Sequence, residues 1–345
     1  MRRVPAIRSQ WLTLLAACLG LGMLMVDMFV VNVALPAIGR DLQARLSAIE
    51  WIVSGYVLVI GVLPVAMGRL GDIFGRRRIY LAGLVTFILA SIACGMAHSI
   101  ATLVVFRVVQ GVGAATMMPG TLAIITQAFP PQQRGLAIGI WGGVSGLGLI
   151  AGPLLGGLLV SGDSWRWIFL VNVPLGAIAL ALALLFVPES RDESIPRTVD
   201  WPGLVLLSGA VFLLLFGVTQ AHAAGWTSPR LLTYFGASSA ALIAFVVIER
   251  RTYAPLVDLT LFRNGTFVMA CLCSLLFSAA VFGSQPYISL FMQNSWGFSP
   301  LQSGLAFLPA TVLVALMMPV SGLIGQQLGP RLRLAIMAGS LAVVV

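Results

Sequence analysis

Lysine is absent from this chain of 345 residues, and acidic residues and histidines are scarce: the chain has 11 acidic residues and two histidines against 20 arginines. Charged residues make up 9% of the chain, whereas they make up about 25% of an ordinary soluble domain. So few charges cannot cover the surface of a water-soluble protein. This composition argues strongly against a soluble enzyme.

Cysteine is also rare, and its placement excludes two other classes of protein. None of the four cysteines pairs with a second cysteine or a histidine at the spacing of a zinc site, and all lie inside apolar runs (Cys18, Cys94, Cys271 and Cys273). We therefore expect neither a metal site nor a disulfide framework, and no cofactor. The net charge of +9 arises from arginine clusters between apolar runs, a pattern typical of membrane topology rather than of nucleic-acid binding.

Long apolar runs, in contrast, recur along the whole chain. They have about the 20 residues that a helix needs to cross a hydrocarbon core of ~30 Å, so they predict an all-α membrane protein. About ten and a half spans are expected. Ten lie near residues 11–38, 51–70, 79–98, 101–126, 135–160, 166–187, 201–222, 231–248, 266–292 and 303–325, and an eleventh begins near Leu334. Because the eleventh run stops at Val345, about halfway across, we expect a C-terminally truncated sequence.

The arginines are distributed unequally between the two sides of the predicted spans. Fifteen fall on the side of the N-terminus and four on the opposite side, while Arg107 lies inside the fourth span. Cytoplasmic loops of membrane proteins are enriched in arginine and lysine. The chain is therefore predicted to be a multi-pass protein of the cytoplasmic (inner) membrane, with its N-terminus in the cytoplasm.

One loop pattern occurs twice. Gly68 to Gly75 joins the second and third spans, and Gly322 to Gly329, with the same glycine spacing, joins the tenth and eleventh. Repeated halves are common in transporters, but a six-plus-six protein would repeat this loop after six spans rather than eight. Two spans inserted between the halves explain why the loop recurs after eight spans. They predict that the complete protein has fourteen spans. The expected parts are an N-terminal six-helix half (1–190), two inserted central spans (191–260) and the incomplete start of a C-terminal half (261–345).

Two charged residues are predicted at membrane depth. Asp27 lies inside the first span, where a carboxylate costs about 2.5–3.5 kcal/mol on insertion scales, so it should face a cavity or a partner. Such a carboxyl group suits a residue that gains and loses protons. Arg107 shares a helix face with Gln110 and keeps its proton, so it needs an acceptor. For both charges a purely structural hydrogen bond or ion pair stays open as the alternative.

The fifth span carries a stripe of glycines. Gly148, Gly152 and Gly156 recur at four-residue intervals, with Pro153 and Gly157 beside them. Such a stripe removes side chains from one helix face, so that another helix can pack or slide against it, and the proline permits a bend. A static packing contact would have the same sequence pattern.

The segment from Gly68 to Arg78 combines three features. Its glycines predict a tight turn, Asp72 could cap a helix N-terminus, and its arginines predict anchoring at the cytoplasmic face.

These segments together resemble the major facilitator superfamily, specifically its fourteen-span drug:proton antiporters (multidrug efflux type). The similarity runs over nearly the whole chain. It rests on residues 27–36 in the first span, the loop 68–78, residues 106–115 in the fourth span and residues 148–157 in the fifth; residues 165–169 with Asn172 and Pro174 also fit.

The resemblance implies a major facilitator fold with alternating access between two six-helix halves, in which proton entry is exchanged for export of an amphipathic compound. It also implies roles for individual residues: proton coupling for Asp27 and Arg107, a conformational latch formed by Asp72, Arg76, Gly68 and Gly75, and an antiporter hinge formed by Gly148, Gly152, Pro153, Gly156 and Gly157.

The sequence departs from the family pattern at two positions. The family usually has a small hydroxyl residue two positions after the acid of the first span, whereas this chain has Phe29, whose ring could reshape the pocket. We take Phe29, Asn32 and Gln110 as candidate cavity residues. Gln326 replaces the acid at the second-half equivalent of Asp72, which weakens a symmetric latch.

The predicted function is therefore a proton-coupled exporter of drug-like or antibiotic-like compounds, a transporter rather than an enzyme. Its expected partners are protons, a small amphipathic substrate and the lipid bilayer, with no nucleic acid, and we expect a monomer. Two alternatives stay open: an exporter dedicated to one metabolite, and a membrane receptor or fragment that transports nothing.

Overall fold

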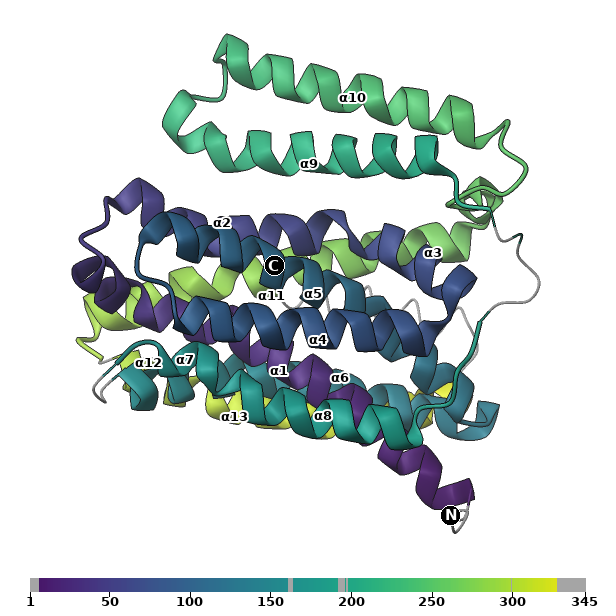
Figure 1. Cartoon of the computed structure of the whole chain (residues 1–345), viewed down its shortest axis with the longest axis horizontal. Helices are drawn as coiled ribbons and strands as arrows, with labels where there is room; N and C mark the ends of the chain where they lie inside the picture. The colour runs from purple at the N-terminus through teal and green to yellow at the C-terminus, as the bar shows by residue number, and fades with distance from the viewer. Residues whose placement is uncertain (1–5, 161–163, 192–195, 197, 299, 328–345) are drawn as a thin grey trace.

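The computed structural model describes residues 6–160, 164–191, 196, 198–298 and 300–327, and every regular element in this part of the chain is a helix (Figure 1). The all-α class is thus confirmed. The helices are α1 (Ala6–Asp41), α2 (Leu46–Val62), α3 (Pro64–Phe74), α4 (Arg76–Gly95), α5 (Ile100–Ala128), α6 (Pro131–Val160), α7 (Trp167–Leu170), α8 (Asn172–Phe186), α9 (Trp201–Ala224), α10 (Pro229–Glu249), the 3-10 helix η1 (Leu259–Arg263), α11 (Gly265–Ser295), α12 (Pro300–Ala306) and α13 (Leu308–Gln327).

Each of the ten predicted spans falls on a helix or on a pair of consecutive helices. Within the described residues, six helices are long and apolar enough to cross a membrane, or seven if the pair α2 and α3 is one span. The span predicted near 51–70 falls on this pair, which bends by 49° at Leu63. Pro64 has no N–H to donate back into α2, so the helix breaks there. The run beginning near Leu334 lies outside the described residues.

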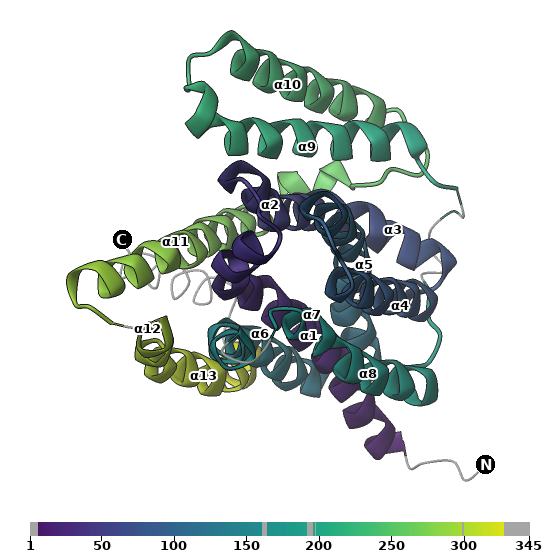
Figure 2. The same ribbon diagram turned by 60° about the vertical axis from the view of Figure 1, so that its left-hand side comes forward.

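Helices α1–α8 pack together as a bundle. Helix α1 is its central element and contacts α2, α5, α6, α7 and α8 (Figure 2). The hairpin of α9 and α10 lies beside this bundle and packs on α2, with the rings of Trp51 and Phe216 5.9 Å apart. Within the hairpin, Ser238 Oγ donates to the carbonyl of Ala210 at 2.8 Å. The division of the chain at 190 and 260 remains a prediction.

Helices α4 and α5 approach each other closely because each presents a glycine at the contact. A Cβ atom added to Gly113 would stand 2.6 Å from the backbone nitrogen of Phe87 and 2.8 Å from the carbonyl oxygen of Gly83. Real Cβ atoms do not come this close to backbone atoms, so both positions need glycine. One to two turns further along, this contact brings Ser91 on α4 next to Gln110 on α5.

Helix α6 lies between α1 and α13, and glycines make both contacts. A Cβ added to Gly152 would stand 2.5 Å from Cβ of Phe29 on α1, and a Cβ added to Gly139 would stand 2.5 Å from Cα of Pro319 on α13. Gly148 and Gly156 also face α1, against Met25 and Val33, while Gly157 has no neighbour within 4 Å among the described atoms. Four of the five predicted hinge residues therefore have a described environment, whereas the side chain of Pro153 lies outside the described residues.

Candidate functional site

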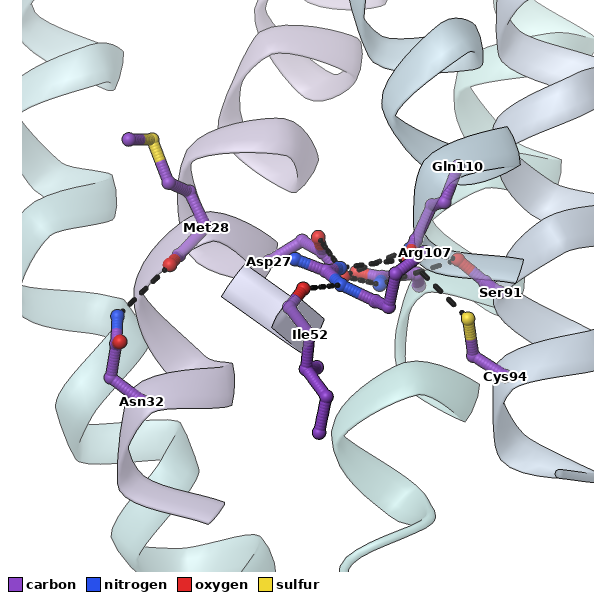
Figure 3. Close-up of polar contacts among 9 residues, drawn as sticks. Asp27, Met28, Asn32, Ile52, Ser91, Cys94, Arg107 and Gln110 are labelled. Atoms are coloured by element: carbon purple, nitrogen blue, oxygen red, sulfur yellow. Dashed lines mark hydrogen bonds and ion pairs between the residues drawn. The ribbon is translucent and has the colours of Figure 1, made fainter. Parts of the chain in front are cut away.

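Asp27 lies within α1 and its side chain is fully buried. Its Oδ2 atom accepts a hydrogen bond from Nη1 of Arg107 at 2.6 Å, which makes a buried ion pair. Its Oδ1 atom accepts from Nε2 of Gln110 and from Nδ2 of Asn172, both at 2.9 Å. Helices α5 and α8 thus provide three donors to one carboxylate, and Figure 3 shows Arg107 and Gln110 converging on it.

The guanidinium group of Arg107 is equally well enclosed, with 1% of the residue exposed. Besides the ion pair, Nη1 donates to Oε1 of Gln110 at 2.8 Å and Nε donates to the carbonyl of Ile52 at 3.2 Å. The centre of the group lies 3.9 Å from the centroid of the Tyr56 ring. A buried cation is compensated here by a carboxylate, two neutral acceptors and an aromatic face.

Helix α4 contributes the outer part of the network. Nε2 of Gln110 donates to Oγ of Ser91 at 2.7 Å, and Sγ of Cys94 donates weakly to Oε1 of Gln110 at 3.7 Å (Figure 3). Oδ1 of Asn172 is buried and has no partner among the described residues. The five helices α1, α2, α4, α5 and α8 therefore meet at Asp27.

This network compensates one buried negative charge with one buried positive charge. While Asp27 is ionised, its charge cancels that of Arg107 and its oxygens accept three hydrogen bonds. If Asp27 takes up a proton, Arg107 becomes a buried cation without a counter-ion, an arrangement that costs several kcal/mol. No group of three or more potential ligands in the described part of the chain could hold a metal ion.

The second predicted cluster forms around Asp72 and Arg76, but its local structure differs from the prediction. The segment from Gly68 to Phe74 is part of α3 rather than a turn, and only Gly75, with φ of +118°, leaves the helix. Asp72 caps no helix N-terminus. It pairs instead with Arg76, one helical turn away, at 2.7 Å; the short linker at Gly75 lets α4 follow α3 directly, which brings this arginine within reach.

The structure adds Glu189, after the end of α8, to this cluster. Its carboxylate accepts from the backbone N–H of Arg77 at 3.2 Å and pairs with Nε of Arg78 at 3.4 Å. A Cβ added at Gly75 would stand 2.5 Å from Oε1 of Glu189. Gly75 is required both for its positive φ and for this approach, so the segment after α8 lies directly against the linker between α3 and α4.

The three candidate cavity residues lie in different surroundings. Gln110 is a buried member of the Asp27 network, and Phe29 packs on Gly152 of α6. Asn32 lies on an exposed part of α1, where its side chain donates to the carbonyl of Met28 at 3.2 Å, away from the network (Figure 3). A substrate contact for any of them remains a prediction.

Sequence reasoning did not identify Ser91 and Tyr56, and it noted Asn172 only as part of a family pattern. A polar residue inside an apolar run was the only available signal for Ser91 and Asn172. The sequence contained no indication of a role for Tyr56, because a tyrosine inside a span usually contributes to packing.

The sequence matches the model of the Major Facilitator Superfamily over residues 17–345. The tetracenomycin C resistance and export protein of Streptomyces glaucescens is 39% identical over 320 residues, which are 93% of this chain and 60% of that protein. The multidrug resistance protein Stp of Mycobacterium tuberculosis is 40% identical over 327 residues, 94% of this chain and 60% of that protein. The lincomycin resistance protein of Streptomyces lincolnensis is 39% identical over 311 residues, which are 88% of this chain and 62% of that protein. This chain thus spans about 60% of the length of the first two relatives.

Two solved structures share the fold. The proton:xylose symporter XylE, bound to 6-bromo-6-deoxy-D-glucose, superposes with a TM-score of 0.60 at 15% identity, covering 92% of this chain and 69% of that chain. The human organic anion transporter MFSD10 superposes with a TM-score of 0.55 at 16% identity, covering 91% of this chain and 72% of that chain. Together with the match over residues 17–345, this shared arrangement of helices means that the chain belongs to the major facilitator superfamily of membrane transporters.

Proposed function

We propose that this chain belongs to a proton-coupled antiporter that exports drug-like or antibiotic-like amphipathic compounds from the cytoplasm by alternating access. The observation that carries the proposal is the fully buried pair of Asp27 and Arg107, a charge switch enclosed by five helices. The class of substrate is taken from relatives named for tetracenomycin C export, multidrug resistance and lincomycin resistance.

The driving step is the protonation of Asp27. A neutral carboxyl group no longer compensates Arg107, and breaking such a buried pair costs about 3–5 kcal/mol. Two conformations of a transporter differ by only a few kcal/mol, so this change is large enough to shift their populations. The proton therefore favours a conformation in which α1 and α5 have moved relative to each other.

The glycine contacts of α6 provide a path by which this movement reaches other helices. Gly152 packs directly on α1 two residues after Asp27, at Phe29, and Gly139 packs on α13 at Pro319. Helices in contact through glycines lose little interdigitation when they slide. We propose that Gly148, Gly152, Pro153, Gly156 and Gly157 are the hinge, and that Asp72 and Arg76, with Glu189, hold one end of the first six spans closed as a latch.

The architecture proposed for the complete transporter has fourteen spans in the cytoplasmic membrane, with the N-terminus in the cytoplasm. In it, α9 and α10 are the inserted pair, which packs on α2 at the side of the bundle. Protons, the amphipathic compound and lipid are the proposed partners of a monomer.

Dye export from everted membrane vesicles tests the coupling role. In vesicles energised by respiration, we expect the wild type to transport a fluorescent cationic dye, an added protonophore to abolish transport, and Asp27→Asn to abolish it as well. Asn keeps a side chain of the same size that cannot carry the proton, but it also leaves Arg107 without its counter-ion, which costs about 3–5 kcal/mol. Protein level and unfolding temperature are therefore measured beside transport, and rates are compared per folded protein. Transport that survives either the protonophore or the substitution contradicts the proposal.

Asp41→Asn is the matched control, because Asp41 lies on the same helix but is exposed and pairs with Arg166 at 3.0 Å. This variant should export dye at the wild-type rate. A second assay separates coupling from binding: Asp27→Asn should still exchange labelled for unlabelled dye across the membrane when no proton gradient is present. Loss of exchange as well would place Asp27 in substrate binding instead.

Export of a single metabolite is a second candidate, since one relative is named for the export of one compound, tetracenomycin C. A panel of chemically unrelated dyes and antibiotics distinguishes the two. A multidrug exporter lowers the accumulation of several members of the panel, whereas a dedicated exporter lowers that of one chemical scaffold only.

A further inference from the structure

A second pair of buried acids lies outside the Asp27 network, where the beginning of α9 meets the end of α10. Asp200 precedes α9 and is 8% exposed, and Glu249 ends α10 and is 3% exposed. One oxygen of each is satisfied: Oδ1 of Asp200 accepts from the backbone N–H of Gly203 at 3.0 Å, and Oε1 of Glu249 accepts from that of Val257 at 2.5 Å. These bonds hold the two carboxyl groups in place.

The remaining two oxygens face one shared space. Oδ2 of Asp200 and Oε2 of Glu249 are buried and find no donor among the described residues. Both oxygens border Gly203, where an added Cβ would contact Oδ2 of Asp200 and lie 2.9 Å from Oε2 of Glu249. Two buried acceptor oxygens therefore border the same point at Gly203, and neither has a donor among the described residues.

No cation of the described residues forms an ion pair with either acid. Arg250 and Arg251 follow Glu249 but are exposed. Asp258 in the next segment is exposed too, and hydrogen bonds from Thr260 lower its pKa. Helix α2, which packs on α9, has Glu50 as its one charged residue, and Glu50 is exposed. Nothing described therefore offsets two negative charges at this position.

We propose that Asp200 and Glu249 bind one proton between them, which makes this pair a proton-binding site separate from Asp27. A shared proton supplies the missing donor between the two oxygens and removes one of two like charges, the arrangement that closely spaced carboxyl pairs adopt. Because Asp200 caps α9 and Glu249 holds the backbone at Val257, the proton fastens the start of α9, the end of α10 and the following segment to one another. This inference does not rest on the proposed export function.

Infrared spectroscopy of the protein in lipid nanodiscs tests for the proton directly. A protonated carboxyl group absorbs at higher frequency than a carboxylate, so a spectrum at acidic pH minus one at alkaline pH should contain a protonated-carboxyl band from this pair. Asp200→Asn and Glu249→Gln should each remove that band, and Asp258→Asn, a substitution of an exposed acid in the neighbouring segment, should keep it. A spectrum unchanged by both substitutions overturns the proposal.

Thermal unfolding as a function of pH provides a second measurement that needs no transport. The folded pair binds its proton more tightly than two separated carboxyl groups in the unfolded chain, so its contribution to stability is present at low pH and is lost as pH rises. We expect the unfolding temperature of the wild type to fall across this titration. In Asp200→Asn and Glu249→Gln the amide donates the missing hydrogen bond without titrating, so this part of the fall should disappear, while Asp258→Asn should behave as the wild type does.

A sodium ion is the competing occupant of two facing carboxylates. Replacing sodium by choline in the buffer should leave the infrared band and the pH dependence unchanged if the ligand is a proton. Stabilisation that requires sodium, with no protonated-carboxyl band, overturns the proposal. Neither readout uses dye export, so a failed export test and a failed proton test remain distinguishable.

Discussion

At Asp27, both oxygens of one carboxylate accept hydrogen bonds from donors on two other helices, α5 and α8. Arg107 reaches Asp27 and Gln110 with Nη1 and the carbonyl of Ile52 with Nε, while its flat face lies over Tyr56. An ammonium group cannot make these contacts together, because its three donors radiate from one atom and it has no flat face.

Arg107→Lys should therefore reduce both stability and export although the charge is kept. Loss of the contacts to Ile52, Gln110 and Tyr56 should cost about 1–3 kcal/mol of unfolding free energy. We expect a lower unfolding temperature in detergent. We also expect export to fall by about tenfold or more, because a cation displaced from Asp27 interacts less strongly with its charge and responds less when that charge is lost. Wild-type export with unchanged stability would contradict this reading of the site.

Asn172→Ala should change the pH dependence of export rather than abolish it. Asn172 donates to Oδ1 of Asp27, and a hydrogen bond to a charged group contributes about 1.5–3 kcal/mol. Removing it takes away one of the three hydrogen bonds that the Asp27 carboxylate accepts, so the pH profile of export should be displaced. Export measured from acidic to alkaline pH should show the displaced profile. Asn32→Ala, which removes an exposed amide on α1, is the control and should leave the profile in place.

Among the helices, the spacing of α4 and α5 determines whether Ser91 can reach Gln110. Gly83 and Gly113 permit backbone contact, and no larger residue fits without moving one helix. The polar network therefore depends on glycines that carry no polar side chain and lie one or more turns away.

Gly113→Ala should destabilise the protein by about 1–3 kcal/mol, because overpacking of a close contact forces the helices apart. The unfolding temperature should drop. The matched control is Gly209→Ala on α9, where an added Cβ meets nothing within 4 Å and where the higher helix propensity of alanine should gain about 0.5–1 kcal/mol. Equal effects of the two substitutions would mean that helix propensity, not close contact, decides both.

At the scale of the whole molecule, glycine contacts in the described part of the chain join α6 both to α1, which carries Asp27, and to α13. A change at the buried ion pair can thus reach the contact at Pro319 through a single helix. The α9–α10 hairpin lies to one side of this path, and its acid pair at Asp200 titrates independently of Asp27 in our proposal.

Gly139→Ala should slow export and leave the Asp27 site intact. The added methyl group meets the backbone of Met318 and Pro319, so α6 and α13 must separate or stop sliding. We expect a lower maximal rate with an unchanged pH profile. Gly236→Ala, at an open position on α10, should export at the wild-type rate, and a displaced pH profile in Gly139→Ala would show that the α13 contact acts on proton binding instead.

The sequence by itself determined the all-helical membrane class, the positions of the spans and the family. Span length and the cost of burying Asp27 or Arg107 depend on consecutive residues, so they can be read along the chain. Only the tertiary structure decided that Asn172 and Ser91 join Asp27, that Asp72 lies within a helix and pairs with Arg76, and that Asp200 meets Glu249. These partners depend on the rotation and spacing of packed helices, which close contacts at residues such as Gly113 set and which no local pattern contains.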